Sequence, residues 1–125
     1  EEWLQSGCPK TASGKWDANN PGTTNLRFIS INNSEVSYTS QNDETHKFEI
    51  SKSSFVSKNQ YLEIKLRPLN NQKKAVLKIR PHLIHMDSQK ETNNPNCLIK
   101  VFIFKDEKHA KTDRYSGWNI FRLIK

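Results

Sequence analysis

Glycine and long apolar stretches are scarce in this chain, and each scarcity excludes a class of protein. The 125 residues include four widely spaced glycines, too few to build a Walker-type or G-x-G-x-x-G phosphate loop. No run approaches the ~20 apolar residues that a membrane-spanning helix needs. No window keeps an apolar period of ~3.6 residues, so any helix is expected to be short. With long helices excluded, we expect the chain to consist mainly of strands and turns.

The usual signatures of catalysis are also missing. There is no G-x-S-x-G nucleophile elbow. His82 and His85 are three positions apart in a predicted strand, so they point to opposite faces, while His46 and His109 lie in or beside loops. Most carboxylates fall in turns among lysines, which indicates solvated surface rather than the facing pair of a glycosidase. We predict a protein that is not an enzyme and has no metal and no cofactor, with a hydrolase as the least favoured alternative.

Cysteine is limited to two residues, Cys8 and Cys97, which lie 89 positions apart. No C-x-x-C pair is present and no histidine lies at metal spacing beside them, so a zinc site is disfavoured. A single disulfide formed in an oxidising compartment is the better interpretation. Closing a loop of that length would stabilise the fold by about 4–5 kcal/mol on the chain-entropy account.

The first residues of the chain also indicate a protein exported to an oxidising compartment. It does not begin with Met, and Glu1-Glu2 is no signal-peptide start, so we expect a secreted or periplasmic protein whose leader has been removed. Residues 1–13 are a turn-rich lead-in, and Cys8 would tether them to the fold. Frequent Asn and Lys residues suggest an AT-rich, bacterial genome.

Strands alternate with turns along the rest of the chain. In the clearest strand, Tyr61 to Arg67, apolar residues alternate with charged ones, and turns recur about every 8–12 residues. Leu98 to Phe104 is densely apolar and predicted to be buried on much of both faces, and a charged loop is predicted over Asp106 to Arg114. We predict one all-β domain over residues 1–125, a single antiparallel up-and-down barrel of about eight strands; a sandwich is the alternative.

Gly14-Lys15-Trp16 precedes the strand series, and Arg122 lies in the last strand. This resembles the calycin barrels, meaning lipocalins, avidins and related small inhibitors, in which G-x-W opens the first strand. In those families a basic residue from a late strand packs across the Trp ring. The resemblance implies that Gly14, Trp16 and Arg122 close one end of the barrel. It also implies a small apolar ligand inside the barrel, or protease inhibition by a free N-terminal segment.

A second resemblance is to small exported bacterial proteins of unknown function that begin with G-x-W-x-N-x-x-P-x-T. It implies an eight-stranded barrel with no assigned activity. The residues that carry it are Gly14, Trp16, Asn20-Pro21 and Thr23-Thr24 near the start, and Phe104, Asp106, Asp113 and Tyr115 near the end.

The charge balance is basic, with a formal net charge of +7. If the predicted hairpin pairs Lys65 with Lys78 and Glu63 with Arg80, cations gather on one outward face. Like charges directly across a sheet cost stability, so such a face indicates anion binding; protection of a sheet edge from aggregation is the alternative. The predicted anion-binding residues are Lys65, Arg67, Lys73, Lys74, Lys78 and Arg80.

Three functional hypotheses follow. The first is a non-enzymatic, exported binding protein, a monomer, whose partner is a small ligand or another protein. The second is binding of a polyanion or a host surface through the basic sheet face. Nucleic acid is disfavoured as that polyanion, because Tyr61 is the only aromatic residue near the face and stacking of bases needs more rings. The third is a protease inhibitor of calycin type.

Overall fold

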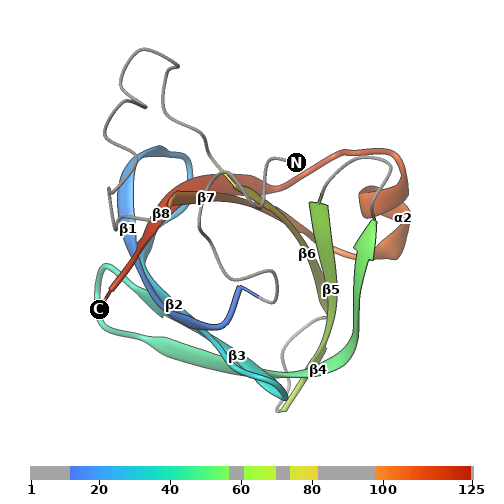
Figure 1. Ribbon diagram of the computed structural model, residues 1–125, viewed down its shortest axis with the longest axis horizontal. Helices are drawn as coiled ribbons and strands as arrows, with labels where there is room; N and C mark the ends of the chain where they lie inside the picture. The colour runs from blue at the N-terminus through green and yellow to red at the C-terminus, as the bar shows by residue number, and fades with distance from the viewer. Residues whose placement is uncertain (1–11, 57–60, 70–73, 82–97, 125) are drawn as a thin grey trace.

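The fold is a closed antiparallel β-barrel with one short helix on its outside (Figure 1). The computed structural model describes residues 12–56, 61–69, 74–81 and 98–124. In this part of the chain each strand pairs with the next, and the last pairs with the first. The elements are β1 (Gly14–Gly22), β2 (Leu26–Ile31), β3 (Glu35–Ser40), β4 (Thr45–Val56), β5 (Tyr61–Pro68), β6 (Ala75–Pro81), β7 (Leu98–Phe104), α2 (Glu107–Lys111) and β8 (Gly117–Leu123).

This arrangement confirms the prediction of an all-β, up-and-down barrel and excludes the sandwich. The charged loop predicted over Asp106 to Arg114 is wrong in part, because α2 forms there. The Asp106 side chain caps that helix by accepting a hydrogen bond from the His109 backbone N–H at 2.8 Å. Cys8, Cys97 and Lys73 lie outside the described residues, so the disulfide remains a prediction.

Apolar side chains fill the barrel interior. Because successive residues of a strand point to opposite faces, every second residue faces inward. Barrels of about eight strands have an interior that such side chains can fill completely. The largest fully buried side chains facing inward are Trp16, Ile29, Val36, Ile64, Leu77, Ile79, Ile99, Val101 and Phe121.

Trp16 lies near the end of the barrel where β1 begins. Its side chain is 0% exposed, and its Nε1 donates to the carbonyl oxygen of Ala12 at 2.9 Å. Gly14 has a φ of 133°, and a Cβ there would lie 2.7 Å from Leu123 Cδ1. Glycine therefore allows the backbone to pass close to β8 at this end.

Arg122 does not lie over the Trp16 ring, contrary to what the calycin resemblance implies. The register of β1 and β8 pairs Trp16 with Leu123 and Asp17 with Arg122. Directly opposite residues share a face of the sheet, so Arg122 points outward while Trp16 points inward. The indole is enclosed by the barrel and by Ala12 instead.

At the opposite end, Asn119 joins β8 to the connection between β1 and β2. Its side chain is 4% exposed, and its Oδ1 accepts hydrogen bonds from the backbone N–H of Thr24, at 3.0 Å, and from the Thr24 hydroxyl. The Thr23 backbone N–H donates to the Trp118 carbonyl at 2.7 Å. These contacts close the barrel next to Gly22.

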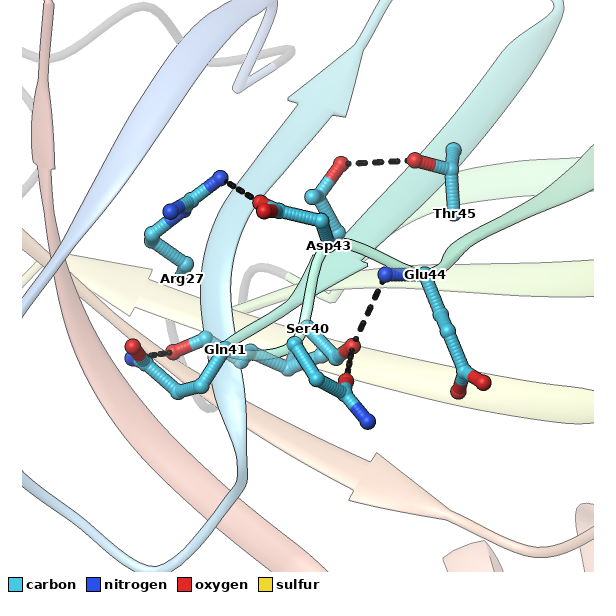
Figure 2. Close-up of polar contacts among 9 residues, drawn as sticks. Arg27, Ser40, Gln41, Asp43, Glu44 and Thr45 are labelled. Carbon is cyan, nitrogen blue, oxygen red and sulfur yellow. Dashed lines mark hydrogen bonds and ion pairs between the residues drawn. The ribbon is translucent and has the colours of Figure 1, made fainter.

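Side-chain hydrogen bonds hold the turn between β3 and β4 at the same end (Figure 2). The Glu44 backbone N–H donates to Ser40 Oγ at 3.2 Å, and Gln41 Nε2 donates to the Leu26 carbonyl at 3.0 Å. Arg27 from β2 pairs with Asp43, which has a φ of 66°. We assign this cluster a structural role, since its contacts bind the turn to β2.

Candidate anion-binding face

The hairpin of β5 and β6 has a register different from the expected one. Glu63 lies opposite Lys78 and Lys65 lies opposite Val76, so Lys65 and Lys78 are not a cross-strand pair. The register differs by two residues from the predicted pairing. A shift of two keeps every side chain on its original face, because the side-chain period of a strand is two. Both cations therefore still point outward, but the like-charge contact on which the prediction depended is absent.

Lys65, Arg67 and Lys78, three of the predicted cations that the structure describes, have carboxylate partners. Lys65 Nζ lies 3.2 Å from Glu107 Oε1, Arg67 Nε lies 3.2 Å from Glu49 Oε1, and Lys78 Nζ lies 2.7 Å from Asp113 Oδ1. Lys74 is exposed before β6, and Arg80 is exposed opposite Lys100 of β7. The predicted residues therefore do not form one surface of unpaired charge.

Lys78 fastens α2 to the barrel wall. Its side chain is only 13% exposed, and its Nζ donates to the Ala110 carbonyl and to Asp113 Oδ1, both at 2.7 Å. The same ammonium lies 5.1 Å from the centre of the Tyr61 ring and 5.0 Å from that of Phe104, within cation–π range. Lys78, on this part of the predicted face, thus holds α2 against β6 and β7, and α2 lies on the outside of the barrel (Figure 1).

The segment around α2 has its carboxylates paired and its cations exposed. The Asp106 carboxylate accepts from the His109 backbone and contacts His109 Nδ1 at 2.7 Å, and these hydrogen bonds lower the pKa of Asp106. Glu107 and Asp113 are bound to Lys65 and Lys78. Within the described part of the chain, four exposed cations of this segment lack a carboxylate partner: Lys105, Lys108, Lys111 and Arg114.

A second group of residues lies on the outer face of β7 and β8. Lys100 Nζ is 4.5 Å from the centre of the Trp118 ring and 5.2 Å from that of Phe102, and these two rings lie directly opposite each other. No carboxylate of the described residues forms an ion pair with Lys100. Its positive charge is therefore held against two aromatic rings rather than neutralised.

Tyr115 connects the two groups. Its side chain is 49% exposed, and its ring lies 5.2 Å from Phe102 and 6.4 Å from Phe104. We name the whole surface the basic–aromatic face. Its residues are Lys100, Phe102, Lys105, Lys108, Lys111, Arg114, Tyr115 and Trp118.

The sequence interpretation did not identify this face, although it contains a signal for it. Lys100 and Phe102 occupy alternate positions within the apolar run from Leu98 to Phe104, and alternate positions share a face. The prediction of burial on both faces concealed this pattern. Phe104 is indeed buried, since Ala110 of α2 packs in the same cluster, whereas Phe102 and Lys100 are half-buried.

The interior side chain of Tyr38 also has an unusual environment. Tyr38 is 8% exposed, its ring lies 5.2 Å from Phe48, and its hydroxyl has no hydrogen-bond partner among the described residues. Burial raises the pKa of Tyr38 above its ordinary value, so the hydroxyl stays protonated and remains a donor. Among the described residues, no group of three or more His, Cys, Asp or Glu side chains is placed to hold a metal ion.

The barrel is consistent with a calycin-like fold. No protein-family model, curated protein or solved structure gives a significant match to this chain. In the described ranges, no helix has the length and apolar character needed to cross a membrane.

Proposed function

We propose that this chain is a non-enzymatic binding protein of calycin type that holds an anionic polymer on its basic–aromatic face. The observation that carries the proposal is Lys100, whose charge lies against Trp118 and Phe102 with no carboxylate partner among the described residues. Unpaired cations on a chain of net charge +7 attract polyanions and raise the rate at which they associate. An exported location and a Cys8–Cys97 disulfide belong to the same proposal.

The arrangement of charge around Lys100 supports the choice of an extended anion. The carboxylates nearest in the chain to the exposed cations of the α2 segment are engaged with the barrel or with the helix cap. Their negative charge is therefore partly cancelled, while the cations stay accessible. Cations spread over a strand and a neighbouring segment suit a ligand with repeated charges better than a single small anion.

We expect Lys100→Ala to weaken binding to a heparin fragment and to make it less dependent on salt. Removing one cation that contacts the polymer reduces the slope of log affinity against log salt by about 1. Affinity is measured by titration at several salt concentrations. Lys47→Ala is the matched control, because Lys47 is an exposed lysine of β4 outside the face. Equal effects of the two substitutions would contradict the proposal.

Tyr38 favours a second candidate function, the binding of a small ligand in the barrel. An unpartnered hydroxyl in an apolar interior would hydrogen-bond an acceptor atom that a ligand brought to it. The inward side chains around it are large and well buried, so we rank this candidate below the first.

Tyr38→Phe separates the two candidates. A buried polar group without a partner costs about 1–3 kcal/mol, so the variant is expected to be more stable by roughly 1 kcal/mol. Because the folded state keeps the phenol proton, wild-type stability is full below pH ~10 and falls above it, at up to about 1.4 kcal/mol per pH unit. The variant should lose this slope in urea unfolding at alkaline pH. Lower stability of the variant at neutral pH would favour a bound partner for the hydroxyl.

A further inference from the structure

We infer that the polymer held by the basic–aromatic face is a single-stranded nucleic acid. This inference depends on the proposed function of the same face and narrows its ligand. The sequence disfavours nucleic acid, because Tyr61 is the only aromatic residue near the predicted basic residues. The face that the fold assembles has three rings, Phe102, Tyr115 and Trp118, beside cations without carboxylate partners in the described residues.

The rings form a continuous strip. Phe102 and Trp118 are a cross-strand pair on the outside of β7 and β8, and Tyr115 packs on Phe102 from the adjoining segment. Tyr115, at 49%, is among the most exposed large apolar side chains of the described chain. Proteins that bind single strands without reading sequence stack exposed bases on such rings, since every base has a π face.

The cations lie along and beside this strip at a suitable spacing. Lys100 and Phe102 are successive outward positions of β7, and such positions repeat every ~6.6 Å. The Phe102 ring and the Lys100 charge therefore arise from positions whose separation is comparable with one step of an extended nucleotide chain. Arg114 precedes Tyr115 in the chain, and Lys105, Lys108 and Lys111 are exposed in the same segment. A single strand can place a base on the exposed Tyr115 ring and its phosphates on the lysines at once, and Lys100, which lies against the rings of Phe102 and Trp118, is one of those lysines.

Other polyanions match only part of this surface. A duplex keeps its bases stacked inside, so the rings would add little to its binding. α2 has five residues and packs on the barrel through Ala110, so it is not placed to enter a groove. A sulfated glycan would gain from the charges but has no planar π system for the rings. The aromatic strip is thus the feature that distinguishes a single strand.

The test is fluorescence anisotropy with the full chain and three probes. These are a labelled oligothymidylate of about 12 nucleotides, within the site sizes of single-strand binders, a duplex of equal length, and a heparin fragment. We expect the oligothymidylate to bind about tenfold more tightly than the duplex. Tyr115→Ala is expected to weaken that binding by roughly 5- to 150-fold, the range for loss of one base–aromatic stack, and to leave heparin binding nearly unchanged.

Two further variants complete the design. Trp118→Phe keeps a ring and most of the packing, and should retain most of the affinity for the oligothymidylate. Phe28→Ala is the ring control, because Phe28 lies on β2 with Lys15 Nζ 4.4 Å above its ring, outside the face. It should leave the affinity unchanged, and thermal unfolding of each variant checks that it is folded.

The outcomes of this test distinguish the single-strand inference from the proposed function, polyanion binding, on which it depends. Equal binding of all three probes, or the same loss in Tyr115→Ala and Phe28→Ala, overturns the single-strand inference and leaves polyanion binding in place. Tight binding of heparin alone also overturns the single-strand inference, and it identifies a sulfated glycan as the polyanion that the face binds. Absence of binding to every probe overturns both.

Discussion

Trp16→Ala is expected to lower the free energy of unfolding by about 3–5 kcal/mol, the cost of deleting a buried large aromatic side chain. The indole is completely buried among Ile29, Phe121 and the other inward residues, so its removal leaves a cavity that a closed barrel cannot collapse. The carbonyl of Ala12 also loses the Nε1 donor that lies 2.9 Å away. Urea unfolding followed by circular dichroism measures the change.

The control for this prediction is Trp16→Phe. Phenylalanine restores most of the ring volume but not the N–H donor, so the loss should be smaller, about 1–3 kcal/mol from the unpaired carbonyl. An unfolding midpoint for Trp16→Ala within error of the wild type would show that Trp16 does not support the end of the barrel. Equal losses in both variants would show that the hydrogen bond, rather than the packing, is what matters.

Gly22→Ala is expected to lower the free energy of unfolding by about 3 kcal/mol. A Cβ at Gly22 would lie 2.1 Å from Cγ and Oδ1 of Asn119 and 2.2 Å from its Nδ2. The Asn119 amide is buried and would have to leave its hydrogen bonds to Thr24. Overpacking and an unsatisfied buried amide each cost about 1–3 kcal/mol. The measurement is again urea unfolding.

Gly117→Ala is the matched control at the same corner of the barrel. A Cβ there would meet Thr24 Cγ2 at 3.0 Å and Thr23 Oγ1 at 3.5 Å, contacts that small shifts of two side chains relieve. Its loss should therefore stay below about 1 kcal/mol. The pair Gly22→Ala with Asn119→Ala should cost less than the sum of the two single substitutions, since the second removes the clash made by the first. Additive losses would contradict this account of Gly22.

The calycin resemblance was informative for some residues and misleading for one. Gly14 and Trp16 lie where the first strand enters the barrel, and the indole is part of the core. Arg122 is next to Leu123, which lies opposite Trp16. Because neighbouring residues of a strand point to opposite faces, Arg122 lies on the outer face. A short motif fixes the residue types at one point of the chain, whereas contact between two strands also requires their relative register.

The sequence by itself determined the fold class and the inward residues. Alternation such as Leu62, Ile64 and Leu66 against Glu63, Lys65 and Arg67 assigns each side chain to a face, because the side-chain period of a strand is two. Turn residues between such runs, as at Gln41 to Glu44, then separate the strands. These are local properties, which the order of residues encodes directly.

Only the tertiary structure decided which cations remain unpaired. A shift of two residues between β5 and β6 leaves the alternation unchanged, so the pattern cannot distinguish Lys65 opposite Lys78 from Lys65 opposite Val76. The partners of Lys65 and Lys78, Glu107 and Asp113, come from a segment far along the chain that folds back over β6. The unpaired charges therefore lie around α2 and at Lys100, and the pairing of β7 with β8 brings Lys100 together with Phe102 and Trp118.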